Sequence, residues 1–478
     1  MSVESCTSLR RTQPRPKTGI VHLGLGAFFR AHAAIYLKEA MALSGGDWGV
    51  IGVSLRSSGM RDKLAQQDFL YTAVEMSELG FNTQLIDVIT DVLVAYEDPE
   101  AVLKAMTDKN ICIVSLTVTE KGYCRGLEDA VLDFQHQDIQ HDLSSKLPRS
   151  APGFLVRALE RRWRNNIRPF TVISLDNLPS NGQLTRQIVC EFASKIDDAL
   201  LRWIQSEVKF PSTMVDRIVP AITQKLIDRT KVKTGIHDPA MVVHEPYRQF
   251  VIEDCFVDNK RPDLIPLGAQ LVSKVKPYED MKLRMLNGTH SALAYIGSLA
   301  GHETVANAIK EESIEDFIDA LWHEEIAKSF DAPPDIDLTK YATKLKSRYQ
   351  NLEICHLLKQ IAMDGSQKLP QRIIHPLFEN LSLGRPYSRL LTVVAAWIRY
   401  LQKQLEPENL AEIDDPLAQE ITAAILASDD DIGLVAQFLK IDPIFGGYPT
   451  NKISDQLISI LKRMGRFENT GLLEGNSE

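Results

Sequence analysis

The stretch Ile20–His32, IVHLGLGAFFRAH, joins an apolar run, a glycine pair and a helix-like pattern in immediate succession. Gly24 and Gly26 stand where a buried strand would turn into a helix. Glycines at such a turn let the chain reverse tightly and let backbone N–H groups approach a pyrophosphate at the start of the helix. Phe29 occupies the place of the third glycine in the usual fingerprint. The turn predicts dinucleotide binding, and a strand turn without a ligand is the alternative.

Short apolar runs rich in β-branched residues recur through the first half of the chain. They are Gly19–Gly26, Trp48–Leu55, Asn110–Val118 and Phe170–Asn177. Helical patterns alternate with these runs, and examples are Arg30–Leu43 and Ala151–Asn166. Runs of this kind suit strands that are buried on both faces. The alternation predicts an α/β fold with a Rossmann-type, doubly wound parallel sheet.

The second half of the chain has a different character, because strand patterns disappear after about residue 275 and amphipathic helical patterns follow one another. These patterns cover Glu312–Phe330, Glu353–Met363, Ser388–Leu405, Pro416–Ala427 and Ser454–Phe467. A chain of 478 residues is also too long for one ordinary core. We therefore expect a Rossmann-type NAD(P)-binding domain over residues 1–278 and a mostly α-helical substrate domain over residues 279–478.

Composition and charge narrow the class of partner. The net charge of −9 argues against nucleic acid or an anionic membrane as a main partner. No apolar run is long enough to span a bilayer, and no signal-type apolar segment follows the basic N-terminal stretch. Six widely spaced cysteines without a C-x-x-C pair are typical of reduced thiols. We expect a cytoplasmic protein with a small-molecule substrate.

The end of the second predicted strand bears on the choice of coenzyme. In NAD-binding folds an acidic residue there holds the ribose 2′-OH. Residues 54–58 contain no carboxylate, and Asp62 is the nearest one. Arg56 and Arg61 could instead meet the 2′-phosphate of NADP, or they could be solvated surface groups. The residues alone leave NAD and NADP both open.

A second stretch, Met281–Gly297, reads MKLRMLNGTHSALAYIG and places three polar groups in an apolar helix pattern. On an α-helix with about 100° per residue, His290 would lie about 80° and Asn287 about 140° round from Lys282. All three side chains could then face one cleft. The structural alternative is a surface lysine, a capping asparagine and a hydrogen-bonded core histidine.

These three groups together suit the interconversion of a carbonyl and an alcohol. A desolvated lysine has a lowered pKa and can exchange the proton near neutral pH. An asparagine N–H can stabilise the developing alkoxide, and a histidine can hydrogen-bond the same oxygen. Such a reaction needs no metal, and the chain shows no zinc-type spacing of cysteine and histidine.

The sequence resembles the mannitol dehydrogenase family from about Gly19 to past Arg372. The segments that carry the likeness occur in family order: GLGAFFRAH, SLTVTEKGY, SLDNLPSNG, MVDRIVPA, EPYRQFVIED, MKLRMLNGTH and AMDGSQKLPQR. The resemblance implies a Rossmann-type domain, a helical domain and an active site between them without zinc. It also implies an enzyme that works as a monomer.

The resemblance implies roles for individual residues. Lys282 matches the general acid/base, and Asn177 and Asn287 match the two carboxamides that hold the reacting oxygen. His290 matches a histidine that contacts substrate, and Glu279 matches a carboxylate linked to proton movement.

Further matches concern the substrate and the coenzyme. Asp216 and Lys368 match substrate-side positions of the family. Phe29 stands where the family usually has histidine, and Ser58–Gly59 replaces the acidic pair of mannitol enzymes. NAD is the expected coenzyme, with NADP as the alternative. The predicted coenzyme-binding residues are Gly24, Gly26, Ala27, Phe28 and Arg56.

The substrate prediction rests on arginines, because arginine binds a carboxylate bidentately. Arg248, Arg284 and Arg372 stand where mannitol enzymes often lack arginine, and Gln360 replaces an arginine typical of them. This pattern is similar to fructuronate reductases (D-mannonate oxidoreductases), whereas GVSLRS near the coenzyme is similar to mannitol enzymes. For each arginine the alternative is a structural ion pair.

The expected reaction is therefore the reduction of D-fructuronate by NADH to D-mannonate. A mannitol 2-dehydrogenase is the first alternative. A dinucleotide-binding regulator without catalytic activity is an alternative from another class, and a zinc-dependent polyol dehydrogenase is a third.

Overall fold

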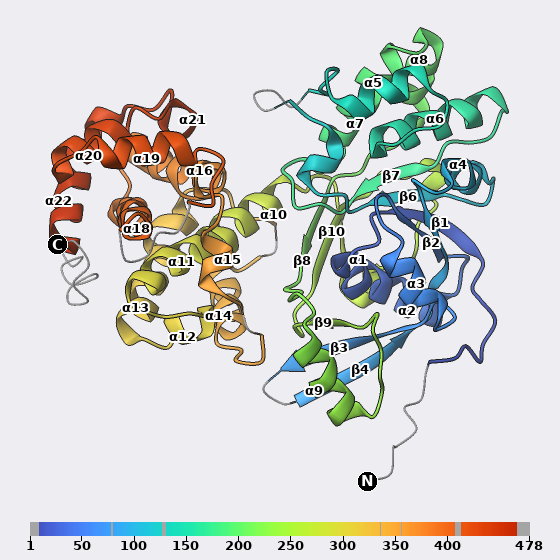
Figure 1. Cartoon of the computed structure of the whole chain (residues 1–478), viewed down its shortest axis with the longest axis horizontal. Coiled ribbons are helices and arrows are strands. Elements are labelled where there is room, and N and C mark those ends of the chain that lie inside the picture. The colour runs from blue at the N-terminus through green and yellow to red at the C-terminus, as the bar shows by residue number, and fades with distance from the viewer. Residues whose placement is uncertain are drawn as a thin grey trace. The chain divides into compact units, whose positions relative to one another are not determined.

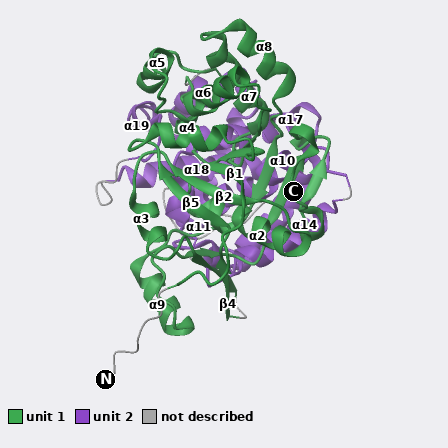
Figure 2. Cartoon of the chain, turned by 90° about the vertical axis from the view of Figure 1, so that its right-hand side faces the viewer, with its two compact units in different colours: residues 1–276 green, residues 277–478 purple. Residues whose placement is uncertain are grey.

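The computed structural model describes residues 9–77, 80–126, 131–334, 336–354, 356–406 and 413–465. The chain divides into two compact units, residues 1–276 and residues 277–478 (Figure 2). The division therefore falls after residue 276, where the sequence placed it after residue 278.

The first unit is built on a sheet of five parallel strands in the order β5-β2-β1-β6-β7. Figure 1 labels β1, β2, β6 and β7 of this sheet. The strands are β1 (Thr18–Leu23), β2 (Gly49–Ser54), β5 (Ile89–Val94), β6 (Ile113–Leu116) and β7 (Thr171–Ser174). The predicted apolar runs correspond to β1, β2, β6 and β7. The strand order reverses between β1 and β6, which is the topological switch point of a Rossmann fold. The prediction of a Rossmann-type parallel sheet is confirmed.

Side chains alternate between the two faces of this sheet. In β1, Val21 and Leu23 belong to one apolar cluster, whereas Ile20 belongs to the other. Helices from between the strands cover the two faces, so the strands are buried on both sides. The helices on the Val21 side are α4 (Pro99–Thr107), α6 (Ala151–Arg164), α7 (Asn181–Ser194) and α8 (Asp198–Glu207), and those on the Ile20 side are α1 (Ala27–Ala31) and α2 (Ala33–Ser44).

Two further sheets complete the first unit. One has the order β11-β10-β8 and contains β8 (Thr213–Asp216), β10 (Gln249–Glu253) and β11 (Gln270–Val272). The other has the order β4-β3-β9 and contains β3 (Tyr71–Ser77), β4 (Gly80–Ile86) and β9 (Val242–His244). The remaining helices of this unit are α3 (Gly59–Ala65), α5 (Gln137–Ser144) and α9 (Gln224–Thr234). The sequence patterns did not predict these two smaller sheets.

The described part of the second unit is helical and contains no named strand. Helix α10 (Lys276–Met281) leads into it. Its α-helices are α11 (Thr289–Leu299), α12 (Val305–Ala308), α13 (Glu312–Ala320), α14 (Leu338–Tyr349), α15 (Leu358–Ala362), α16 (Gly365–Leu369), α17 (His375–Ser382), α18 (Ser388–Gln404), α19 (Ala418–Leu426), α20 (Asp431–Phe438), α21 (Asp442–Phe445) and α22 (Ser454–Met464). Three segments have the wider π-helical turn, namely η4 (Lys282–Gly288), η5 (Leu321–Glu325) and η7 (Pro370–Ile374). The helical C-terminal domain is confirmed.

Two predicted helices end differently from their patterns. Among the described residues of the pattern Glu353–Met363, Leu358–Ala362 are α-helical, and Leu357 before them forms an isolated antiparallel bridge with Thr304. The pattern Ser454–Phe467 is helical to Met464, and its residues 466 and 467 lie outside the described ranges.

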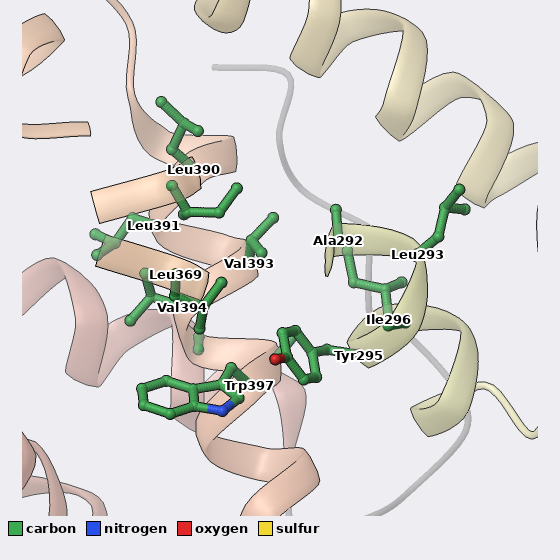
Figure 3. Packing of buried hydrophobic residues seen from close by; sticks show 14 of the residues in the cluster. Ala292, Leu293, Tyr295, Ile296, Leu369, Leu390, Leu391, Val393, Val394 and Trp397 are labelled. Atoms are coloured by element: carbon green, nitrogen blue, oxygen red, sulfur yellow. The ribbon is translucent and has the colours of Figure 1, made fainter. Parts of the chain in front are cut away.

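Helices α11 and α18 form the centre of the second unit's core. Figure 3 shows Tyr295 of α11 and Trp397 of α18 within the same apolar cluster. A Cβ on Gly365 of α16 would lie 2.5 Å from the Trp397 indole nitrogen and 2.8 Å from the Tyr295 hydroxyl. Glycine is required there because the backbone approaches both side chains closely. This core holds the two π-helices that carry the candidate catalytic groups.

Candidate active site

The glycine turn lies at the carboxyl end of β1, beside the switch point of the parallel sheet. Gly24 has φ +88°, and a Cβ there would lie 2.1 Å from the carbonyl oxygen of Thr117. Its N–H donates a hydrogen bond to the carbonyl of Val53, 2.8 Å away. Gly26 has an ordinary φ of −84°, is exposed and precedes α1. The first glycine therefore makes the turn, and the second leaves open space at the start of the helix.

A buried histidine supports this turn. The Thr117 hydroxyl donates to the Gly24 carbonyl at 2.7 Å, and the His22 Nε2 lies 3.0 Å from that hydroxyl. The His22 Nδ1 lies 2.9 Å from the Ser115 hydroxyl. Burial lowers the pKa of His22 to about 3, so the ring is neutral near pH 7. Phe29 stacks on His22 with the ring centroids 3.6 Å apart.

Other predicted coenzyme residues differ in their surroundings. Ala27 and Phe28 are half-buried in α1, and Arg56 is exposed after β2. Arg61 forms ion pairs with Asp62, at 2.9 Å, and with Glu97. Because these carboxylates already hold the Arg61 guanidinium, only Arg56 remains as an exposed candidate for a 2′-phosphate at this strand end.

Asn177 lies in the loop after β7, at the same edge of the parallel sheet as the glycine turn. Its side chain is exposed, whereas the neighbouring Asp176 is buried. Carboxyl ends of parallel strands at a switch point are where such folds bind ligands. The structure thus presents the first predicted carboxamide at the expected edge.

Two predicted substrate residues lie in or directly before strands of the β11-β10-β8 sheet. Asp216 ends β8, is only 4% exposed and pairs with Gln249 of β10. Arg248 precedes β10 and forms an ion pair of 2.6 Å with Glu39 of α2. Its guanidinium also lies 4.2 Å from the ring centre of Tyr36. The contacts of Arg248 therefore match the structural ion pair that was the alternative to carboxylate binding.

The helix that carries the lysine is not α-helical at that point. Lys282 begins the π-helix η4, which runs to Gly288, whereas α-helical geometry was assumed for the sequence prediction. A π-helix makes i→i+5 hydrogen bonds, so residues five apart lie closer in angle than on an α-helix. The separation of about 140° expected for Lys282 and Asn287 is therefore wrong. Lys282 is 9% exposed and Asn287 is half-buried.

His290 follows on α11 and is 8% exposed. Its Nε2 is buried and has no hydrogen-bond partner among the described residues. Burial holds the pKa of His290 well below its usual value, and the nearby His356, Arg348, Arg372 and Lys282 lower it further. The ring is therefore neutral near pH 7. The structure does not support the alternative of a fully hydrogen-bonded core histidine.

Two arginines of this unit differ in their partners. Arg284 forms an ion pair of 2.7 Å with Glu379 and also donates to the carbonyl of Ser329. Arg372 of η7 donates to the Ser291 hydroxyl at 3.2 Å and to the Asn287 carbonyl at 3.4 Å. Of the three predicted arginines, Arg372 is the one that forms no ion pair with a carboxylate within the described ranges.

Close packing of η4 on η7 brings these groups together. A Cβ on Gly288 would lie 3.1 Å from the Arg372 carbonyl oxygen, so the two π-helices approach closely. Lys368 precedes η7 and donates to the Met363 carbonyl at 2.6 Å, and burial lowers its pKa. Glu279 lies on α10, one turn before Lys282, and is half-buried.

Sequence reasoning missed His356, whose ring lies 5.0 Å from the His290 ring. Burial, with Arg348 adding to it, lowers the pKa of His356 to about 4, and its Nδ1 is buried with no hydrogen-bond partner in the described part of the chain. It lies within the pattern Glu353–Met363, which was interpreted only as an amphipathic helix. The signal that could have identified it is the histidine itself, because it lies in the segment before the predicted Lys368.

Across the described residues, no cluster of three histidine, cysteine, aspartate or glutamate side chains could hold a metal ion. None of the described helices combines the length and apolar character that crossing a bilayer requires.

Two family models match the chain. The mannitol dehydrogenase Rossmann domain matches residues 18–265, and the mannitol dehydrogenase C-terminal domain matches residues 274–463. The D-mannonate oxidoreductase of Escherichia coli K12 is 42% identical over 411 residues, which are 85% of this chain and 84% of that protein. The mannitol 2-dehydrogenase of Aspergillus terreus is 37% identical over 439 residues, 90% of this chain and 87% of that protein.

A solved structure is similar over nearly the whole length. The mannitol 2-dehydrogenase of Pseudomonas fluorescens, in a ternary complex with NAD and D-mannitol, has a TM-score of 0.82 and 34% identity. The match covers 96% of this chain and 93% of that one. The two family models together cover the glycine turn and the lysine-bearing helix, which belong to the two domains of this family. The chain belongs to the mannitol dehydrogenase family and is an oxidoreductase that acts on CH–OH groups.

Proposed function

We propose that the protein is a fructuronate reductase, which reduces D-fructuronate to D-mannonate with NADH. The observation that carries the proposal is a group of donors in the second unit without acidic partners. His290 has a buried, unpartnered Nε2, and Arg372 has no carboxylate among the described residues. A buried polar group without a partner is costly, so a ligand that satisfies it is favoured. A substrate with both hydroxyl groups and a carboxylate satisfies both residues.

The first unit fits a dinucleotide. Its glycine turn lies at the switch point, and Gly26 leaves space at the start of α1. The Pseudomonas fluorescens relative was solved with NAD. When bound, the coenzyme supplies a hydride to the carbonyl carbon. We assign Gly24, Gly26, Ala27 and Phe28 to its binding, and Arg56 to its adenosine side.

The chain's own residues handle the proton and the oxygen. As the C–H bond forms, the electron pair of the C=O bond moves to oxygen, and the Lys282 ammonium gives that oxygen its proton. Lys282 is buried, at 9% exposure, so the proton comes from a group that is shielded from bulk water. The carboxamides of Asn177 and Asn287 donate hydrogen bonds to the developing alkoxide. His290, neutral near pH 7, contacts a substrate hydroxyl.

The remaining assignments concern the ends of the substrate. Arg372 binds the carboxylate, and Lys368 and Asp216 bind hydroxyl groups. Glu279, one turn before Lys282, returns the proton to the lysine from solvent. The described cysteines are free, which supports our proposal that the protein works in the cytoplasm.

Mannitol 2-dehydrogenase is the second candidate, and specific contacts favour it. Arg248 is bound to Glu39, and Arg284 is bound to Glu379. Two of the three arginines that suggested a carboxylate substrate therefore have carboxylates of their own. The distinction between a sugar acid and a neutral polyol then depends on Arg372.

The test follows NADH and NADPH oxidation by absorbance with D-fructuronate and D-fructose side by side, in the wild type and in Arg372→Leu. We expect turnover of D-fructuronate, and a fall in its kcat/KM of about 10- to 100-fold in Arg372→Leu, because a charged hydrogen bond is lost. Arg261→Leu is the matched control, since Arg261 is ion-paired with Asp254 at 2.9 Å. Turnover of D-fructose alone would reject the fructuronate proposal and establish the mannitol reaction.

A further inference from the structure

A buried carboxylate lies beside the predicted catalytic carboxamide and is not part of the reaction described above. Asp176 is 9% exposed and directly precedes Asn177. Its Oδ1 accepts the N–H of Thr119 at 2.9 Å, and its Oδ2 accepts the N–H of Val118 at 3.1 Å. The Asp176 side chain therefore ties the loop after β7 to the loop after β6.

The same carboxylate closes a ring of hydrogen bonds. The Tyr123 hydroxyl donates to Asp176 Oδ2 at 2.8 Å and lies 2.6 Å from the Ser174 hydroxyl. The Asp176 N–H lies 3.3 Å from the Ser174 hydroxyl oxygen. Because the tyrosine proton points to Asp176, the Ser174 hydroxyl donates to the tyrosine oxygen. Every polar group of the ring is satisfied, and this favours a single arrangement.

The backbone on the Asn177 side is held as well. The Asn181 side-chain amide donates to the Asp176 carbonyl at 3.0 Å, and its oxygen accepts the Thr213 N–H at 2.9 Å. The exposed Asn177 is thus preceded by a residue whose side chain and carbonyl are both fixed. A catalytic group placed on such a loop needs little reorganisation.

Thr119, on the other side of the clamp, has an unusual backbone. Its φ is +63° and its ψ is 169°. This region is essentially restricted to glycine and is strained for a β-branched residue. Such a conformation persists only where surrounding contacts impose it. Two hydrogen bonds hold Thr119 on either side: its N–H donates to Asp176 Oδ1 at 2.9 Å, and its carbonyl accepts the Gly122 N–H at 3.0 Å.

We propose that Asp176 is a positioning residue that holds Thr119 in this glycine-type conformation and thereby sets the loop that presents Asn177. The proposal rests on the function proposed above, in which Asn177 binds the reacting oxygen. Asp176 itself touches neither substrate nor coenzyme. It acts through the geometry of two loops at the edge of the parallel sheet.

The test is a cycle of variants in the full-length protein. Asp176→Asn keeps the shape but places an amide where two N–H groups need an acceptor, and we expect kcat to fall about 10- to 100-fold. Adding Thr119→Gly should restore most of the loss, because glycine adopts the conformation without help. Adding Thr119→Ala instead should restore nothing, because alanine keeps the Cβ. Equal behaviour of the two double variants, or a wild-type kcat in Asp176→Asn, would overturn the proposal.

A second measurement uses the single variants Thr119→Gly and Thr119→Ala. It does not depend on whether Asp176→Asn folds. Thermal unfolding of Thr119→Gly should occur about 2–4 °C above that of Thr119→Ala, since only glycine relieves the strain. A higher midpoint for the alanine variant would contradict the strained conformation.

The failure of this proposal can be told apart from failure of the proposed function. Kinetic assays are run with D-fructuronate and NADH and with D-mannitol and NAD⁺, because both reactions would use the same carboxamide. Asn177→Ala is measured in parallel. A wild-type kcat in Asn177→Ala would reject the role of Asn177, whereas a large loss there together with no loss in Asp176→Asn would reject the role of Asp176 alone.

Discussion

The rings of His290 and His356 meet edge to face at 5.0 Å, and each has a buried nitrogen without a hydrogen-bond partner among the described residues. Stable folds rarely leave two adjacent imidazoles in this state. Burial lowers the pKa of both rings and positive neighbours lower it further, so both stay neutral at physiological pH. Neutral imidazoles can donate at one nitrogen and accept at the other, which suits sugar hydroxyl groups.

Replacing His290 with leucine should therefore separate activity from stability. We expect kcat/KM for the sugar substrate to fall about 10- to 100-fold, whereas the thermal midpoint should not fall, because an unsatisfied buried polar group is removed. Steady-state kinetics and calorimetry measure the two effects. His356→Leu should also lower kcat/KM for the sugar substrate. A clear loss of stability with full activity would show that His290 serves packing only.

The role of Lys282 can be tested by two replacements. Lys282→Met keeps much of the buried side-chain volume but removes the proton donor, and Lys282→Ala removes both. Both should lower kcat by about 10²- to 10⁴-fold. Binding of NADH, followed by its fluorescence, should stay within about threefold of the wild type because the residues that we propose to bind the coenzyme lie in the first unit. Turnover of Lys282→Met at a wild-type rate near neutral pH would rule out the acid/base assignment.

The two glycines of the turn should respond differently to alanine. Gly24→Ala would place a Cβ 2.1 Å from the Thr117 carbonyl at a φ of +88°, so we expect a loss of several kcal/mol in unfolding free energy. Gly26→Ala meets no atom closer than 3.8 Å and should fold normally. Its KM for NADH should nevertheless rise, because the added methyl occupies the approach to the pyrophosphate. Urea unfolding and coenzyme titration of both variants separate these effects.

The folded protein should begin to lose stability at pH values well above 3. His22, His32 and His244 have pKa values lowered to about 3, chiefly by burial, from an ordinary value of 6.5. Between about pH 3 and pH 6.5 the unfolded chain binds more protons than the folded protein. The stabilisation that comes from these neutral histidines is therefore fully present above pH 6.5 and is lost as the pH falls toward 3. Each histidine contributes a slope of up to about 1.4 kcal/mol per pH unit.

Urea unfolding at several pH values measures this slope. His244→Asn should reduce it by about one histidine's contribution. Val243→Ala, on the same strand, should lower stability at every pH without changing the slope. An unchanged slope in His244→Asn would mean that this histidine does not take up a proton on unfolding.

The sequence predicted those parts of the molecule that local patterns determine. Strands β1, β2, β6 and β7 follow from apolar runs, and Gly24 follows from the need for a tight turn. The smaller sheets were missed because their pairing is distant; Ala73 of β3 pairs with Val242 of β9. Short strands that depend on such partners carry little signal of their own.

Distance along the chain also explains the uncertainty about the arginines. Arg248 and its partner Glu39 are 209 residues apart, and Arg284 and Glu379 are 95 apart. No local pattern shows that these arginines already have carboxylates. The π-helix at Lys282 was hidden for a similar reason, since the residues Lys282–Gly288 have an ordinary helical composition and the wide turn packs against η7.

The contacts of the glycine turn also determine when it can form during synthesis. His22 reaches Ser115, and Gly24 accepts a hydrogen bond from Thr117, in each case 93 residues further along the chain. A nascent chain that has not yet released β6 from the ribosome therefore lacks the groups that hold the turn. Parallel pairing over such separations is slow, because the intervening loop must close first. Nascent chains should thus bind a dinucleotide only after β6 has emerged. The chain length at which binding begins would show when the parallel sheet assembles.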